Sequence, residues 1–234
     1  NKFVKLYYPI WSKALLNNQA SGRIKKPVNG DIVIFDNNES FYRFMKSVTE
    51  GQSKVALVRP GNAYDHCLDS IYEITPGNES HIKALFTELT KRGFVIEKII
   101  FLWPLRPDVL EGKDQNTLLQ MTYLSTVFIC QAMILSQKPI GVSFLYVYRY
   151  SNGKEQVING AMSGFAKTLG QENPAYRMKI IGIETTEQNS DAALINQSLL
   201  GELEDGKISE IRYAGGIRYQ KTYELINKDN GAPF

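Results

Sequence analysis

Residues 115–137 read QNTLLQMTYLSTVFICQAMILSQ, a stretch without any charged residue. Asp114 precedes it as a candidate N-cap, and Lys138-Pro139 follows it, which predicts a helix with defined ends. At helical spacing the stretch has two apolar rows, Leu119, Tyr123, Val127, Cys130 and Ile134 on one and Met121, Leu124, Phe128 and Leu135 on the other. A surface helix of a globular protein normally has one apolar stripe and a charged back. We therefore expect this helix to be covered on two sides.

The two covers have several interpretations. The simplest is the chain's own sheet on one side and a second helix layer or another domain on the other. A core helix wholly enclosed within this chain is the alternative. A membrane span is disfavoured because Gln120, Thr122, Ser125 and Gln131 interrupt the apolar surface.

Composition narrows the class of protein. The chain has 234 residues, 43% of them hydrophobic, so it can build a sizeable core in one large or two small domains. Its formal net charge is +3 and its basic residues form no run, so a nucleic-acid partner is not expected. Cys67 and Cys130 provide no disulfide framework, and no cysteine or histidine cluster predicts a metal site. No signal peptide is recognised, so we expect a soluble cytoplasmic protein, or a piece of one, without a membrane partner.

Apolar runs and helical patterns alternate along most of the chain. Strands are predicted at residues 31–36, 54–59, 97–103, 141–150 and 178–184, a short strand and turn at 72–78, and helices at 38–50, 79–92, 115–137, 157–171 and 190–204. A strand over residues 3–16 contains Pro9 and is expected at a sheet edge. Residues 209–225 predict a hairpin turning at Ala214-Gly215-Gly216, and residues 227–234 read as a linker. The pattern predicts an α/β fold with a degenerate Rossmann-like core at 31–204, a mostly parallel sheet and helices on both faces.

The first strand-to-helix turn lacks what a dinucleotide site needs. Such a site requires glycines there, so that backbone amides approach the pyrophosphate. Here the turn is FDNNES at residues 35–40, and it places Asp36 and Glu39 where phosphate oxygens would lie. We expect no nicotinamide cofactor in this chain. We also expect the turn to be an inert connection, so that Asp36→Asn changes stability by no more than about 1 kcal/mol.

The central helix–strand–helix unit resembles the short-chain dehydrogenases. In that family the last of these helices carries a Tyr-x-x-x-Lys pair, and the segment GAMSGFAKTLGQENP at 160–174 is similar to the stretch that follows it. Counting back places Glu155 at the tyrosine position and Asn159 at the lysine position. Neither residue can do that chemistry, and Tyr148 and Tyr150 have no lysine four residues on. No catalytic residue is predicted.

Several weak motifs in a fixed order resemble one family more closely. They are YPIW at 8–11, FLWPL at 101–105, ENP at 172–174, IGIE at 181–184 and EIRYAGGIRY at 210–219. Together they are similar to the structural subdomain of a modular polyketide synthase ketoreductase, spanning residues 1–226. The resemblance implies a cofactor-free scaffold half. The following catalytic half would bind NADPH and reduce β-ketoacyl groups that an acyl carrier protein holds on phosphopantetheine, in antibiotic-type polyketide biosynthesis.

The resemblance also implies an interface, because equivalent helices of the two halves meet face to face in that family. The expected interface residues are Leu119, Tyr123, Val127, Phe128, Gln131, Gly160, Ser163 and Gly164. Other enzyme classes fit less well. A stand-alone reductase and a methyltransferase-like α/β domain both need a glycine-bearing first turn. A hydrolase is disfavoured because Ser143 lacks the second glycine of its motif. A His66–Cys67 nucleophile pair is disfavoured because neighbours in a loop-like stretch seldom face each other.

Overall fold

A computed structural model describes residues 5–15, 29–136, 141–151, 157–185, 192–205 and 210–226. These residues form a sheet of ten strands in the order β1-β10-β9-β8-β7-β6-β2-β3-β5-β4. The strands are β1 (Tyr7–Lys13), β2 (Asp31–Phe35), β3 (Val55–Pro60), β4 (Asp65–Leu68), β5 (Ile71–Ile74), β6 (Ile96–Phe101), β7 (Val142–Tyr150), β8 (Tyr176–Glu184), β9 (Glu210–Ala214) and β10 (Ile217–Leu225). The seven central strands, β5 to β9 in that order, pair in parallel, and β1, β10 and β4 pair antiparallel. The predicted fold class, a mostly parallel α/β sheet with a C-terminal hairpin, is confirmed.

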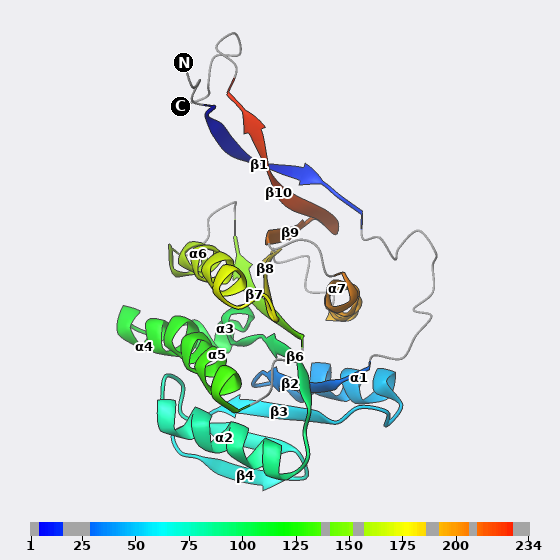
Figure 1. Ribbon diagram of the computed structural model, residues 1–234, viewed down its shortest axis with the longest axis vertical. Coiled ribbons are helices and arrows are strands. Elements are labelled where there is room, and N and C mark those ends of the chain that lie inside the picture. The colour runs from blue at the N-terminus through cyan, green and yellow to red at the C-terminus, as the bar shows by residue number, and fades with distance from the viewer. Residues whose placement is uncertain are drawn as a thin grey trace.

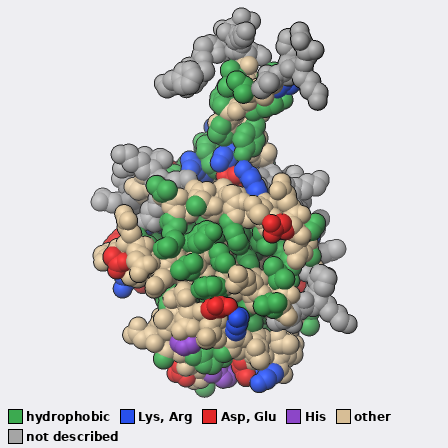
Figure 2. All heavy atoms as spheres, turned by 60° about the vertical axis from the view of Figure 1, so that its left-hand side comes forward, with side chains coloured by type: hydrophobic (Ala, Val, Ile, Leu, Met, Phe, Trp, Pro, Cys, Tyr) green, Lys and Arg blue, Asp and Glu red, His purple; other side chains and the backbone are tan. Residues whose placement is uncertain are grey.

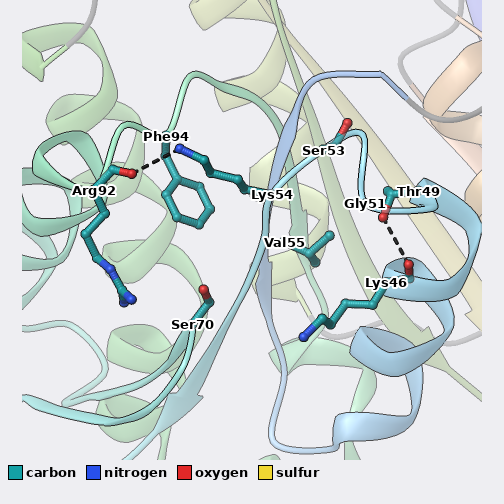
Figure 3. Close-up of a pocket in the computed structure, with 9 residues that line it drawn as sticks. All are labelled: Lys46, Thr49, Gly51, Ser53, Lys54, Val55, Ser70, Arg92 and Phe94. Atoms are coloured by element: carbon teal, nitrogen blue, oxygen red, sulfur yellow. Dashed lines mark hydrogen bonds between the residues drawn. The ribbon is translucent and has the colours of Figure 1, made fainter.

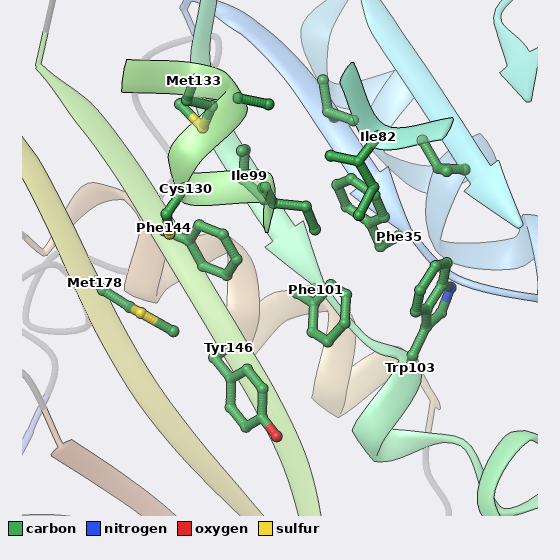
Figure 4. Close-up of a cluster of buried hydrophobic side chains, with 14 of the residues drawn as sticks. Phe35, Ile82, Ile99, Phe101, Trp103, Cys130, Met133, Phe144, Tyr146 and Met178 are labelled. Carbon is green, nitrogen blue, oxygen red and sulfur yellow. The ribbon is translucent and has the colours of Figure 1, made fainter. Parts of the chain in front are cut away.

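Helices cover both faces of this sheet (Figure 1). One face carries α2 (Glu79–Lys91), α4 (Gln115–Leu119), α5 (Ser125–Ser136) and α6 (Val157–Glu172), and the other carries α1 (Glu39–Thr49) and α7 (Ala192–Glu204). Each face has its own apolar core. Phe35, Phe101 and Phe144 belong to the first (Figure 4), and Ile34, Leu57 and Leu145 to the second. Successive residues of a strand point to opposite faces of the sheet. Because both faces are covered, both sets of side chains in each central strand are apolar, and the sequences of these strands are continuous hydrophobic runs.

The strand order reverses between β2 and β6. From β2 the chain proceeds to β3 and β5 on one side, and from β6 to β7, β8 and β9 on the other. In open parallel sheets such a switch point leaves a crevice outside the carboxyl ends of the strands, and ligands bind there. The switch point is therefore the first place to look for a site.

Strands β1 and β10 form a two-stranded ribbon that projects from the body (Figure 1). Ile226 N donates to Leu6 O and Ala14 N donates to Arg218 O, so even-numbered residues of β1 bond to β10. Pro9 therefore faces the outer edge, where its missing N–H weakens pairing with a further strand.

The base of the ribbon is fixed by buried charges. Glu202 is fully buried and accepts hydrogen bonds from Lys179 Nζ at 2.7 Å, Arg218 Nε at 2.6 Å and Tyr213 OH at 2.8 Å. Burial alone would raise the pKa of Glu202, but the hydrogen bonds and charges of Arg218 and Lys179 outweigh it and hold that pKa below its usual value. The network ties β8, α7, β9 and β10 together.

Three predicted elements differ in the structure. Residues 65–68, read as part of a loop, form β4, which pairs with β5. The strand predicted to reach Trp103 ends at Phe101, where a 3₁₀ turn, η2 (Trp103–Leu105), and the short helix α3 (Pro107–Leu110) follow. The helix predicted to run unbroken over 115–137 contains a π turn, η3 (Gln120–Leu124), between α4 and α5. Residues 137–140 and the predicted linker 227–234 lie outside the described residues.

Candidate functional site

The switch point is filled by an ion pair. Asp36, the residue after β2, has no exposed surface, and Arg106 reaches it from the segment after η2. Arg106 Nε donates to Asp36 Oδ1 at 2.7 Å and Nη2 donates to Oδ2 at 2.6 Å, a bidentate pair. The expectation that this turn is inert is wrong, because Asp36 is neither a surface residue nor the helix cap. Asn38 is the cap, and its side chain accepts from Ser40 N at 2.8 Å.

The first turn of α1 is occupied by a carboxylate with two guanidinium partners. Glu39 accepts from Arg43 Nη2 at 2.6 Å and pairs with Arg59 at the end of β3. The hydrogen bond from Arg43, with the charges of both arginines, lowers the pKa of Glu39. A pyrophosphate at the N-terminus of α1 would lie beside the carboxylates of Asp36 and Glu39. The electrostatic repulsion expected from the sequence therefore has a basis in the structure.

An indole fills the space beside the ion pair. Trp103, at the start of η2, is fully buried, and its ring meets Phe35 edge-on at 5.5 Å and Phe101 at 5.2 Å (Figure 4). Side chains from the ends of β2 and β6 thus pack together at the switch point. A hollow of about 330 Å³ lies elsewhere, beside β3.

The position at which the short-chain dehydrogenases carry their lysine is also buried in this chain. Asn159 is 3% exposed, and its Oδ1 accepts from Tyr146 OH at 2.9 Å. Burial raises the pKa of Tyr146, so this phenol stays protonated across the physiological range. Glu155, placed at the tyrosine position, lies outside the described residues. This polar pair belongs to the core and does not face solvent.

The cysteines and histidines do not form a nucleophile pair. His66 stacks on Tyr72 with ring centroids 4.7 Å apart, and the Cys67 thiol contacts Asp65 Oδ2 at 4.0 Å. Burial raises the pKa of Cys130 to about 12, so it is not a thiolate at neutral pH. Since the whole sequence has two cysteines and two histidines, covalent acyl transfer through an imidazole-activated thiol has no support here.

A basic hollow of about 330 Å³ lies at the opposite end of the sheet, beside β3 (Figure 3). Lys46, Lys54 and Arg92 line it, but their groups have local partners. Lys54 Nζ donates to Arg92 O at 3.0 Å and Gly93 O at 2.6 Å, the carbonyl end of α2. Arg92 Nη1 donates to Asp69 O and to Tyr72 OH, and Lys46 lies over the ring of Tyr42 in the last turn of α1. These cations complement two helix C-termini, which is a structural role.

The uncharged helix buries Met121, Ile129 and Met133 together with three hydroxyl residues, and it leaves other large apolar residues at the surface. Its small hydroxyl residues Thr122, Ser125 and Thr126 are fully buried against the body, while large apolar residues face outward. Thr122 Oγ1 and Thr126 Oγ1 each donate to a carbonyl one turn earlier, at 2.6 and 2.8 Å, which satisfies them inside the core. The outward residues are the exposed Leu119, Ile134 and Leu135 and the half-buried Tyr123, Leu124, Val127 and Phe128. Figure 2 shows hydrophobic side chains gathered at the centre of this face.

The predicted row assignment therefore needs correction. The π turn holds one more residue than an α turn, so a continuous 3.6-residue repeat assigns the wrong neighbours across it. Cys130 and Met121, assigned to different rows, are both buried. The sequence alone did not assign a structural role to Ser125. The only indication of such a role was a hydroxyl residue within an otherwise apolar run.

The eight predicted interface residues divide into two groups. Leu119 and Gln131 are exposed on α4 and α5, Tyr123, Val127 and Phe128 are half-buried beside them, and Gly160 and Gly164 are exposed on α6. Tyr123 meets Phe165 of α6 edge-on at 6.1 Å, which joins the two helices into one surface. Ser163 is turned away from this surface and donates to Glu210 Oε2 at 2.9 Å. We name Leu119, Tyr123, Val127, Gln131, Gly160 and Gly164 the docking face.

One helix among the described residues, Gln115–Leu135, is long and apolar enough to cross a membrane by length and composition. It lies on the sheet, with Ile129 and Met133 buried in the core. The core helix of an α/β protein meets the same criterion. Also within the described part of the chain, no group of three or more acidic, histidine or cysteine side chains is arranged to hold a metal ion.

Solved structures show what this fold resembles. A keto acid-selecting nonribosomal peptide synthetase module containing adenylation, ketoreductase and pseudo-Asub parts matches with a TM-score of 0.79 at 20% identity, over 94% of this chain and 18% of that chain. An N-terminal ketoreductase from the macrolactin assembly line matches with a TM-score of 0.75 at 20% identity, over 95% and 45%. A short-chain dehydrogenase/reductase from Serratia marcescens matches with a TM-score of 0.54 at 12% identity, over 81% and 98%. At these identities the likeness shows the fold alone, and this chain spans less than half of the first two proteins.

Family comparison corrects the sequence interpretation. A search of curated proteins found no match. The family model described as beta-ketoacyl synthase-like, N-terminal, matches residues 30–202, more than half of the chain. The identification as a ketoreductase structural subdomain, and the scaffold function derived from it, are therefore wrong, since weak motifs spread along a common fold are a less specific signal than this match. The chain belongs to the beta-ketoacyl synthase-like, N-terminal family.

Proposed function

We propose that this chain is part of a polyketide- or nonribosomal-peptide-type synthase, and that the docking face is a protein–protein contact surface. The observation that carries the proposal is the group of large apolar side chains that the helix formed by α4, η3 and α5 leaves at the surface. Three hydroxyl residues are buried while Leu119, Val127 and their apolar neighbours face outward. An exposed apolar patch is the informative exception to ordinary burial, and patches of this kind mark interfaces.

The surface has the composition of an interface core. The helix contributes no charged residue to it, and charge depletion with aromatic enrichment distinguishes the centre of a protein–protein contact. Tyr123 and Phe165 supply the aromatic rings, and Gly160 and Gly164 on α6 allow a partner backbone to approach closely. A Cβ added at Gly164 would meet nothing within 4 Å, so the space above this helix is open to a partner.

We also propose that no nicotinamide cofactor binds at the switch point. The bidentate Arg106–Asp36 pair and Trp103 occupy the switch point, and Asn159 is bonded to Tyr146 in the core. Breaking the buried ion pair to admit a dinucleotide would leave a charge without its partner, which is costly. We therefore propose that cofactor binding and contact with a carrier protein and its phosphopantetheine arm belong to neighbouring parts of the synthase.

The test uses the isolated chain, whose docking face has no partner other than a second copy. Two apolar faces without formal charge can meet through a twofold axis without repulsion. We expect reversible dimerisation with a dissociation constant of about 10–100 µM, or roughly −6.8 to −5.5 kcal/mol. Sedimentation equilibrium should show that Val127→Lys weakens the dimer at least about tenfold while the monomer stays folded, because a half-buried lysine extends its ammonium to water.

The matched control is Leu68→Lys, on the edge strand β4. Leu68 is 70% exposed, more than Leu119 of the docking face at 39%. Replacing it removes as much exposed apolar surface without touching α4, α5 or α6, so it should leave the dimer unchanged. A wild-type chain that remains monomeric at several hundred micromolar, or equal weakening by both variants, would contradict the docking assignment.

A further inference from the structure

The π turn in the docking helix has a defined hydrogen-bond pattern. Ser125 N donates to Gln120 O, the five-residue spacing of a π-helix, and also to Thr122 O. The Ser125 side chain reinforces the wider turn, since its Oγ donates to the same Gln120 carbonyl at 2.7 Å. Ser125 has no exposed surface.

A second element holds this turn from outside the helix. Gly77, in the turn between β5 and α2, donates its backbone N–H to Ser125 Oγ at 2.8 Å. Its φ of +70° lies in the left-handed region that favours glycine. A Cβ at this position would lie 2.8 Å from Gln120 Cβ and 3.1 Å from Gln120 Cα, so only glycine fits against the π turn.

The extra residue in the turn decides what α4 presents. Relative to a continuous α-helix, it offsets α4 from α5 by one position, about 100°. Leu119, 39% exposed, consequently stands on the outer side, while Leu118 is half-buried against the core. In a continuous α-helix anchored through α5, Gln120 would take the outer place and Leu119 the half-buried place of Leu118.

We propose that Ser125 and Gly77 are positioning residues that hold the π turn and thereby place Leu119 in the docking face. The role of Leu119 in docking rests on the proposed function, whereas the geometry of the π turn does not depend on any partner. Thr122 and Thr126 are buried hydroxyl residues on the same helix, and each donates its hydroxyl to a backbone carbonyl one ordinary turn back along it. They separate the effect of losing a buried hydroxyl from the effect of releasing the π turn.

The experiment measures maleimide labelling of single cysteines in the full chain at about 1 µM, below the expected dimerisation range. The background carries Cys67→Ser and retains Cys130, which is buried. Leu119→Cys and Leu118→Cys are compared with Ser125 present and in the Ser125→Ala variant. With Ser125, position 119 should label faster than position 118. In Ser125→Ala, position 119 moves inward, and the ratio of the two rates should fall by about threefold or more, because labelling follows thiol exposure.

Thr126→Val is the matched control and should leave the ratio unchanged. If Ser125→Ala does not fold, Gly77→Ala replaces it, since its Cβ must displace Gln120 and should shift the ratio in the same direction. An unchanged ratio in the folded Ser125 or Gly77 variant, or an equal shift in Thr126→Val, would overturn the inference. The sedimentation test with Val127→Lys fails or succeeds separately, so loss of the docking function and loss of the positioning role are distinguishable.

Discussion

The ion pair at the switch point gives the sharpest test of the described geometry, through Asp36→Asn. The carboxylate has no exposed surface and accepts both hydrogen bonds of a bidentate pair. Asparagine retains one acceptor but turns an amide N–H₂ toward the guanidinium and removes the charge. One charge-assisted bond is lost and the other loses its anionic acceptor, and bonds to charged groups contribute about 1.5–3 kcal/mol each. Arg106 is 24% exposed, so water recovers part of the loss, and we expect about 2–3 kcal/mol of destabilisation in total.

Urea unfolding of the full chain measures this change. For a slope of about 2–3 kcal/mol per molar urea, the midpoint should fall by roughly 1 M. Asp108→Asn is the control, because Asp108 forms its hydrogen bond with Asn37 at the exposed rim of the same region. In a double-mutant cycle with Arg106→Leu, the coupling energy between positions 36 and 106 should exceed about 1.5 kcal/mol. A loss below about 0.5 kcal/mol for Asp36→Asn would refute the claim that this pair closes the switch point.

Three further predictions follow from the buried groups and the closed crevice. Because its pKa lies below the usual 4.5, Glu202 contributes stability that is present above about pH 4.5 and is lost as the pH falls through the lower folded value. Glu202→Gln should therefore flatten the fall in urea stability between neutral and acidic pH, and an unchanged pH dependence would contradict the network's role. The two thiols should differ at pH 8, with Cys67 reacting at once with a disulfide reagent and Cys130, whose pKa burial raises to about 12, reacting only on unfolding. Immediate reaction of both thiols in the folded protein would show that the α5 core opens. Calorimetry with NADPH should detect no binding tighter than about 100 µM, roughly −5.5 kcal/mol, and saturable binding below that value would contradict the closed site.

Much of the fold was predictable because strands buried on both faces read as short apolar runs. β2, β3, β6, β7 and β8 all carry that signal, and the alternating helices imply parallel order. β4 was missed because Asp65, His66 and Cys67 are exposed at a sheet edge and leave no apolar pattern. The strand end at Phe101 was missed because Trp103 is as apolar as the strand, although it turns back to fill the switch point.

The candidate site was less predictable because it depends on contacts that are distant in the sequence. The uncharged stretch 115–137 predicted a helix covered on two sides, and the docking proposal follows from that expectation. Its periodicity could not reveal the π turn, which is held by Gly77 from another element. Asp36 looked like a surface turn residue because its partner, Arg106, lies 70 positions away. The sequence motifs indicated the wrong family because proteins of the same fold share them. Such motifs do not distinguish between the families that adopt the fold.

Concentration-dependent protection of single cysteines tests the docking face most directly. Val127→Cys and Leu68→Cys, each in a background without Cys67 reactivity, are labelled over a range of protein concentrations spanning about 1–300 µM. The account predicts that labelling at position 127 slows severalfold as the protein associates, while labelling at position 68 keeps its rate. Equal rates at position 127 across the whole range, or protection of position 68 in its place, would contradict the claim that this face is where the chain docks.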